Sequence, residues 1–471
     1  MSADLAALTL VEVADAIRSG AASAREVTEA CIARVERLQR VVNCFTSFDP
    51  GSALAQADRA DARRAAGEPL GPLHGVPLAH KDMFYRQGLV TTCGSRIRRD
   101  YRPTYTATVL ERLEAAGALH LGGLNMSEFA LSPTGHNSHF GPARNPWNPE
   151  YITGGSSSGS GAATAARLVF AALGSDTAGS IRLPAAACGV VGIKPTHTRV
   201  SRYGAMGLSF SLDSVGPLAR TVRDCARVLG VIAGYDPRDA TSSRQPVPDY
   251  EAATLAPDIA GLRIGTPENY YYDTVDDEVR ERLEASLAVF ESLGARRVGV
   301  RIPDHEHLAG LANAVQWSEA ATLHDAWLRE CPQDYGPQVR ARLELGFAYS
   351  ATQYLSAAHV RPRIIRSFVS SVFQQCDILH LPAIPIPLPT IAETGVEDRE
   401  GFAELLASLS RCTRPINYLA LPGLSLPAGF DANGLPTAFQ LVGRPFAETT
   451  LFRAGAAYEA TTNWTRQTPP L

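Results

Sequence analysis

The stretch ITGGSSSGSGAATAARL, from Ile152 to Leu168, joins a run of glycine and serine directly to a helix-forming segment. Gly and Ser fill every position from 154 to 161, a composition typical of flexible linkers. A linker should separate two folded units, whereas AATAARLVFAAL continues at once with good helix formers. A Gly/Ser loop that opens a helix can instead point backbone N–H groups at an anion. The stretch therefore predicts a functional loop inside a folded unit.

Two catalytic interpretations of this region are alternatives to a flexible linker. Residues 155–159 match G-x-S-x-G, the nucleophile elbow of α/β-hydrolases, which would make Ser157 the nucleophile. That motif follows a strand, and the preceding GPARNPWNPEYIT contains three prolines, which makes it a poor strand. The other interpretation places the nucleophile downstream, in LGSDTAGSIRLPAA. There, small residues before Ser180 allow a tight loop with several N–H groups directed at one point.

A serine nucleophile needs a base, and Lys81 in GVPLAHKDMF is the candidate. A lone lysine is ordinarily exposed, but Lys81 follows a short apolar stretch at the expected end of a strand. Burial there would lower the lysine pKa from its usual ~10.4 and leave the amine neutral at working pH. The sequence therefore favours Lys81 as the base for Ser180.

Composition places the chain among globular proteins. Of 471 residues, 45% are apolar and 20% charged, and the net charge of −4 gives no field that favours nucleic acid or a membrane. The first twenty residues lack the pattern of a signal peptide, and no apolar run is long enough to span a bilayer. Eight scattered cysteines without C-x-x-C predict buried, reduced thiols in a cytoplasmic protein.

The chain is expected to form a single domain over residues 1–471, because no break in composition divides it. Residues 1–65 predict N-terminal helices, since Thr9-x-x-Glu12 and Ser23-x-x-Glu26 match the capping box. In the segment 70–225 short apolar stretches alternate with helical ones, which predicts an α/β sheet covered by helices. The segment 300–370 is helical and rich in Trp and Tyr, which makes it a candidate wall of a substrate pocket.

Taken in order, these motifs resemble the amidase signature family, from about residue 24 to residue 463. GVPLAHKD resembles the strand with the family's lysine, GGSSSGSGAATAA its Gly/Ser catalytic loop, and GSDTAGSIRLPAA its nucleophile loop. The resemblance implies an α/β fold, a large mixed β-sheet covered on both faces by helices, with N-terminal helices. It also implies a Ser–cis-Ser–Lys triad in which Ser180 is the nucleophile, Ser156 the cis-peptide serine and Lys81 the base.

The implied reaction is amide hydrolysis through an acyl-enzyme, without a cofactor. Neutral Lys81 accepts a proton from Ser180 through Ser156, and Ser180 attacks the carbonyl carbon. The oxyanion is expected to be held by four backbone N–H groups, those of Thr177, Ala178, Gly179 and Ser180. Supporting roles are expected for Ser157, which would hydrogen-bond within the loop, and for Asp176 and Arg182, which would brace it as an ion pair. Ala178 stands where the family usually has glycine.

The expected substrate is an apolar or aryl amide, an anilide or a carbamate, and the candidate pocket residues are Met126, Phe129, Gly154 and Arg342. KPTHTRVSRYG and SLDSVGPLARTVRD resemble one branch of the family, the glutamine amidase subunit of tRNA-dependent amidotransferases. That resemblance assigns Arg342 to the carboxylate of glutamine. Ser410 stands where an acidic residue is expected to hold the glutamine amine. The sequence therefore favours a stand-alone hydrolase, and the alternative is the glutamine amidase component of an amidotransferase.

The expected partners are the small-molecule amide or carbamate and a second copy of the chain in a homodimer. Neither nucleic acid nor a membrane is an expected partner. His305-x-His307 and His136-x-x-His139 lack a third ligand in the pattern, so no metal site is expected.

Overall fold

The structure, a computed structural model, describes residues 4–303, 305–395 and 400–471. Its strands form a sheet in the order β1-β3-β2-β4-β6-β5-β10-β11-β9-β7-β8. The eleven strands of the described chain are β1 (Phe45–Phe48), β2 (Pro77–Lys81), β3 (Leu119–Leu124), β4 (Ala171–Asp176), β5 (Val191–Lys194), β6 (Ser214–Ala219), β7 (Arg263–Pro267), β8 (Arg296–Val300), β9 (Ile378–Pro382), β10 (Gly423–Phe430) and β11 (Pro436–Gly443). Parallel pairs at β3-β2-β4 and β9-β7-β8 flank antiparallel central strands, so the sheet is mixed, as expected.

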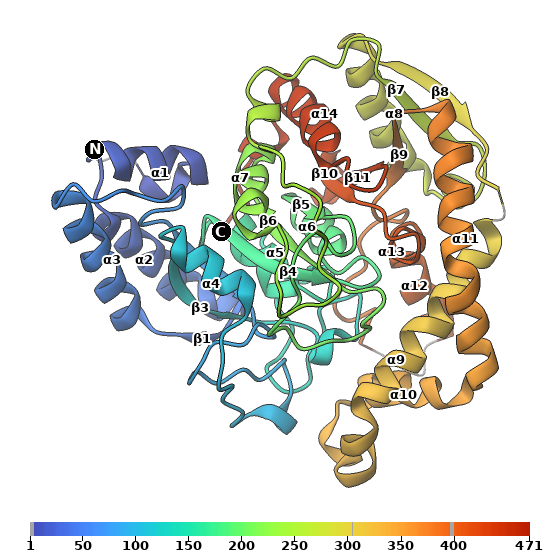
Figure 1. Cartoon of the computed structure of the whole chain (residues 1–471), viewed down its shortest axis with the longest axis horizontal. Coiled ribbons are helices and arrows are strands. Elements are labelled where there is room, and N and C mark those ends of the chain that lie inside the picture. Colours follow the sequence, from blue (N-terminus) through green and yellow to red (C-terminus); the bar gives the residue numbers. More distant parts are fainter. Residues whose placement is uncertain (1–3, 304, 396–399) are drawn as a thin grey trace.

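Helices cover both faces of this sheet (Figure 1). The fourteen α-helices of the described residues are α1 (Leu10–Ser19), α2 (Ala24–Val42), α3 (Pro50–Ala65), α4 (Thr108–Ala115), α5 (Ser158–Ala165), α6 (Arg182–Cys188), α7 (Val222–Ile232), α8 (Asp277–Ser292), α9 (Leu308–Glu330), α10 (Pro337–Glu344), α11 (Ala351–Gln375), α12 (Phe402–Leu409), α13 (Arg414–Tyr418) and α14 (Glu448–Thr461). Adjacent residues of β10 mark the two faces, because Gly423 faces Arg182 of α6 and Leu424 faces Gly455 of α14.

Both predicted capping boxes are present at the N-terminus. The Thr9 hydroxyl accepts the Glu12 N–H at 3.2 Å, and the Glu12 carboxylate accepts the Thr9 N–H at 2.8 Å. Ser23 caps α2 in the same way, and α1 ends at Gly20 in the left-handed conformation, with φ 78°. These local signals explain why α1 and α2 begin where the sequence predicts, and the left-handed conformation of Gly20 explains where α1 ends.

The N-terminal segment 1–65 is not all helical, which corrects the sequence-based prediction. Phe45–Phe48 forms β1, which pairs antiparallel with β3 at the edge of the sheet. Asn43 ends α2 in the left-handed conformation, with φ 48°, and Pro50 begins α3. The four residues FTSF between these stops favour a strand, because aromatic and β-branched side chains pack well on a pleated surface.

The sheet brings the three sequence motifs together. β2 ends at Lys81 and β4 ends at Asp176, and these strands are parallel neighbours. Parallel neighbours end at the same edge of a sheet, so the loops that follow β2 and β4 lie close together. Helices α9, α10 and α11 lie on the side of the molecule away from α1–α3 (Figure 1).

The cysteines agree with the expectation of reduced thiols. All eight are unpaired, and all except the partly exposed Cys331 are buried. Within the described ranges, no helix has the length and apolar character needed to cross a membrane.

Leu424 tests the core at the centre of the sheet. Its side chain is fully buried, so truncation in Leu424→Ala should leave a cavity and lower the free energy of unfolding by about 2–5 kcal/mol. Leu255→Ala is the matched control, because Leu255 is 61% exposed and its loss should change stability by about 0.5 kcal/mol or less. Urea unfolding followed by tryptophan fluorescence measures both, and equal losses would contradict this assignment of the core.

Candidate active site

Lys81 is fully buried at the end of β2. Its Nζ lies 2.6 Å from the Ser156 Oγ and 2.9 Å from the Ser175 Oγ. Burial lowers the Lys81 pKa to about 7, although the Asp213 and Asp176 carboxylates act in the opposite direction. A large fraction of Lys81 is therefore neutral near pH 7, which a proton acceptor requires.

Ser156 and Ser157 belong to the loop that opens α5. The peptide bond between Gly155 and Ser156 is cis. Ser157 hydrogen-bonds locally, as expected, because its Oγ donates to the Ser175 carbonyl at 3.2 Å. Its N–H donates to the Ser180 carbonyl at 3.3 Å, which joins the Gly/Ser loop to the nucleophile loop.

Ser180 lies just before α6 and lines a cavity, whereas Lys81 and Ser156 are fully buried. A substrate in the cavity therefore reaches Ser180 and not the two residues behind it. This arrangement fits a nucleophile whose proton leaves toward the protein interior.

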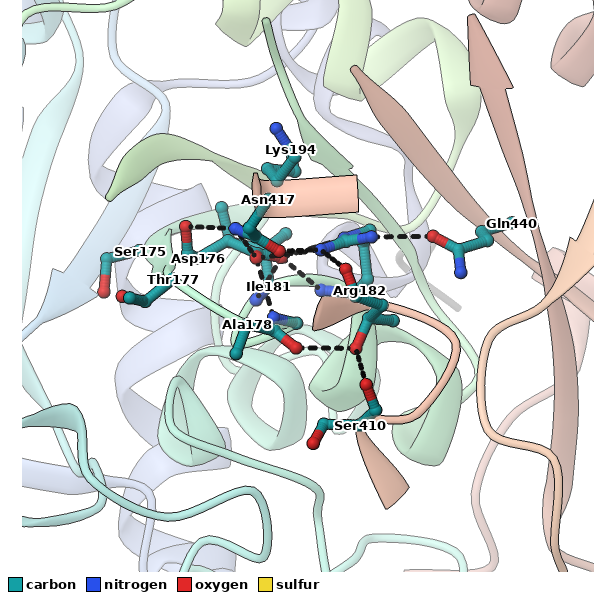
Figure 2. Close-up of polar contacts among 12 residues, drawn as sticks. Ser175, Asp176, Thr177, Ala178, Ile181, Arg182, Lys194, Ser410, Asn417 and Gln440 are labelled. Atoms are coloured by element: carbon teal, nitrogen blue, oxygen red, sulfur yellow. Dashed lines mark hydrogen bonds and ion pairs between the residues drawn. The ribbon is translucent and has the colours of Figure 1, made fainter. Parts of the chain in front are cut away.

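Asp176 and Arg182 form an ion pair under the nucleophile loop (Figure 2). Both side chains are fully buried, and the Arg182 Nη2 lies 3.0 Å from the Asp176 Oδ1. Burial alone would raise the Asp176 pKa, but the Arg182 guanidinium and the hydrogen bonds around the carboxylate lower it to about 2. Asp176 is therefore ionised across the physiological range and does not serve as a proton donor.

The ion pair also connects the loop to distant strands and helices. The Arg182 Nη1 donates to the Gln440 Oε1 of β11 at 2.7 Å, and the Asn417 side-chain amide of α13 donates to the Asp176 Oδ1 at 2.8 Å. Thr413, just before α13, donates its hydroxyl to the Ala178 carbonyl at 2.6 Å. These contacts connect the nucleophile loop and Arg182 to the α13 segment and to β11, and those of Asn417 and Gln440 can be followed in Figure 2.

One of the four expected oxyanion donors is already occupied by a hydrogen bond within the loop. The Gly179 N–H donates to the Asp176 Oδ1 at 2.8 Å, so it is not directed at a substrate oxygen. Gly179 has φ 132°, and a Cβ there would lie 2.3 Å from the Thr413 hydroxyl, so only glycine fits. Thr177, Ala178 and Ser180 line the cavity and remain the candidate donors.

The cavity beside Ser180 has a volume of about 570 Å³. Helices α9 and α10, from the segment predicted to line a pocket, form one wall. α12 and α13 contribute another. The lining residues are Ala130, Leu131, Ser132, Pro133, Thr177, Ala178, Ser180, Leu183, Leu208, Asn313, Gln316, Trp317, Gln338, Ala341, Arg342, Leu345, Phe402, Ala403, Leu406, Ala407, Ser410 and Arg414.

Of the four candidate pocket residues, the structure places only Arg342 in this wall. Phe129 instead packs among aromatic side chains, stacked on Trp327 with ring centroids 5.5 Å apart. Met126 is fully buried in the core. A Cβ on Gly154 would lie 2.7 Å from the Leu183 carbonyl, so that backbone is packed against α6 rather than open to substrate.

Sequence reasoning missed several residues of the site. Ser175 contacts Lys81, and Asp213 accepts the Thr177 hydroxyl at 2.5 Å. Ser175 immediately precedes Asp176 and points to the other face of β4, so its contact with Lys81 arises only because β4 pairs with β2. Arg414 in the cavity wall comes from a segment far along the chain, and its spacing gives no signal either. Among the described residues, no group of His, Cys, Asp or Glu has the arrangement to hold a metal ion.

Comparisons with known proteins agree with this geometry. A family model described as Amidase matches residues 26–452. The A subunit of the glutamyl-tRNA(Gln) amidotransferase of Thermosynechococcus vestitus is 42% identical, over 95% of this chain and 97% of its own. The corresponding protein from Thermotoga maritima has a solved structure that matches with a TM-score of 0.81 and 33% identity, over 98% of this chain and 96% of that one.

A second solved structure, with inhibitor bound, is described as an unexpected vestigial protein complex that reveals the evolutionary origins of an s-triazine catabolic enzyme. It matches with a TM-score of 0.90 and 37% identity, over 96% of this chain and 98% of that one. The family model, these relatives and the shared fold show that this chain belongs to the amidase signature family and is an enzyme that hydrolyses an amide C–N bond.

Proposed function

We propose that this chain is the amidase component of an amidotransferase-type assembly, and that it releases ammonia from a small carboxamide that carries a carboxylate. The buried Lys81–Ser156 contact behind Ser180 carries the chemical part of this proposal. The relatives at 42% identity, named as the A subunits of glutamyl-tRNA(Gln) amidotransferases, support the assembly part. They favour this function over the stand-alone hydrolase and the homodimer expected from the sequence.

The reaction begins when neutral Lys81 takes the proton of Ser156, which in turn takes the proton of Ser180. The Ser180 Oγ attacks the carbonyl carbon, and the N–H groups of Thr177, Ala178 and Ser180 stabilise the oxyanion. The proton returns through Ser156 to the nitrogen, the C–N bond breaks, and ammonia leaves an acyl-enzyme. Water then attacks the ester, loses a proton to the same relay, and releases the carboxylate product with Ser180 restored.

The charges of the cavity favour an anionic substrate. Arg414 lines it without an ion-pair partner among the described residues, and no Asp or Glu is among the lining residues that the structure describes. A guanidinium binds a carboxylate by charge-assisted hydrogen bonds, whereas an apolar or aryl amide brings no charge to compensate the Arg414 cation. A carboxylate-bearing amide therefore fits better than the aryl amide, anilide or carbamate expected from the sequence.

Labelling with a fluorophosphonate, followed by peptide mass spectrometry, tests the triad. The adduct is expected on Ser180, and Lys81→Ala and Ser156→Ala should each slow labelling by about 100-fold or more, because the proton relay is lost. Ser158→Ala is the matched control from the same Gly/Ser loop, and it should label at the normal rate. An adduct on Ser157 would support the nucleophile elbow and contradict the triad.

The pH dependence of kcat/KM tests the state of Lys81. Only the neutral amine accepts a proton, so kcat/KM should rise about tenfold per pH unit below pH 7 and level off above it. Burial also lowers the pKa of Lys194 to about 7, but the Nζ of Lys194 donates to the Pro195 carbonyl rather than to the triad. A flat profile, or a midpoint that disappears in Lys194→Gln, would contradict this role of Lys81.

Substrate preference tests the proposed function as a whole. Ammonia release from glutaramate, which carries a carboxylate and a carboxamide, should have a kcat/KM at least about tenfold above nitroaniline release from p-nitroacetanilide, because only glutaramate brings an anion to the Arg414 guanidinium. The opposite order would favour the stand-alone aryl amidase.

The assembly part needs a separate measurement on the same protein. Isolated by an affinity tag from its native cells and sized by light scattering, the chain should run as a complex with a stoichiometric second polypeptide. A homodimer with full activity would contradict the assembly.

A further inference from the structure

Arg414 is a cation of the cavity wall, and no carboxylate of the described residues forms an ion pair with it. Its Nη2 donates to the Ser410 hydroxyl at 2.8 Å, and its buried Nε has no hydrogen-bond partner among the described residues. Burial lowers its pKa, but an arginine stays protonated in proteins. A buried positive charge in a ligand cavity is compensated when an anion binds.

The position of Arg414 ties it to the reacting centre. Thr413, its neighbour in the chain, donates its hydroxyl to the Ala178 carbonyl of the nucleophile loop. The Thr413 carbonyl also accepts the Arg182 Nη2 at 3.1 Å. The guanidinium is therefore anchored one residue from the contacts that hold the oxyanion donors, on the same cavity as Ser180.

Gln316 of α9 supplies the second observation. Its side chain is only 5% exposed, it lines the cavity, and its Oε1 has no hydrogen-bond partner among the described residues. Asn313, one turn earlier, also lines the cavity with an unpartnered Oδ1. Side-chain amides present both a donor and an acceptor, which is the complement of another amide or of a ureido group.

These features argue against an ammonium ion in the same cavity. Glutamine carries an α-ammonium group. In this cavity that group would lie beside the Arg414 guanidinium, and no carboxylate among the described lining residues would bind it. Like charges that share a poorly solvated site repel strongly. The volume of about 570 Å³ also lies in the range of pockets for drug-sized ligands, which leaves room for an extended acyl group.

We propose that the acyl cavity selects an anionic carboxamide whose second nitrogen is a neutral amide or ureido N–H rather than an ammonium. The Arg414 guanidinium binds the anionic group of the substrate, and the Gln316 Oε1 accepts a hydrogen bond from the neutral N–H. This inference rests on the proposed function, because it names the substrate class of the same site.

Three carboxamides that differ at one position test the inference on the full chain. N-carbamoyl-L-glutamine has a neutral ureido N–H where L-glutamine has an ammonium, and glutaramate has neither. The kcat/KM for N-carbamoyl-L-glutamine should exceed that for L-glutamine at least about tenfold. In Gln316→Leu, the ratio of kcat/KM for N-carbamoyl-L-glutamine to that for glutaramate should fall. Equal or better use of L-glutamine would overturn the inference and leave the proposed function standing.

Variants of the cavity wall separate recognition from folding. Arg414→Gln should raise KM for both anionic substrates about 10- to 100-fold without the same loss on neutral valeramide. Arg411→Gln is the matched control, because Arg411 packs over the Tyr270 ring outside this cavity. Ser410→Asp should shift preference toward L-glutamine, a gain that misfolding does not produce.

Two results would distinguish the failures. If Arg414→Gln changes all substrates equally, or if Ser410→Asp does not favour L-glutamine, the assignment of Arg414 is wrong. If no carboxamide is hydrolysed and Ser180 is not labelled, the proposed function itself fails.

Discussion

The nucleophile loop depends on the buried ion pair between Asp176 and Arg182. Its carboxylate accepts the Gly179 N–H, and its guanidinium reaches Gln440 of β11. One pair therefore holds the loop, α6 and the centre of the sheet in a fixed relation, and it explains why Gly179 donates inward while its neighbours are left for substrate. Removing one partner of a buried pair leaves an uncompensated charge and typically costs about 3–5 kcal/mol, so both residues are needed together.

Two basic side chains are fully buried in this region, with different partners. Arg182 forms an ion pair with the Asp176 carboxylate. Lys81 contacts the hydroxyl groups of Ser156 and Ser175, which do not neutralise an ammonium, so burial drives the lysine toward its neutral form. A candidate base and a structural cation can therefore lie in one buried region, because a guanidinium stays protonated in proteins whereas a buried lysine amine can lose its proton.

Sequence reasoning predicted what local patterns encode. The strand that ends at Lys81 and the capped helices α1 and α2 follow from periodicity and capping, and the family resemblance supplied the order of the triad. Neither the local patterns nor the resemblance predicted the direction in which each side chain or N–H group points. Phe129 turns into an aromatic cluster and the Gly179 N–H turns to Asp176, because these choices depend on packing against segments distant in the chain. Ser175 was missed for the same reason, since its role exists only once β2 and β4 pair.

Chemistry and selectivity come from different parts of this chain. Residues 81–182 contain the proposed triad and oxyanion loop, whereas α9, α10, α12 and α13 supply much of the cavity wall. Motifs with fixed spacing identify the first part, and the wall must be read from the structure. Ser410 illustrates the separation, because its hydroxyl contacts Arg414 and not the triad. A carboxylate at that position would neutralise the cation, so one side chain can change which acyl group is accepted while the bond that is broken stays the same.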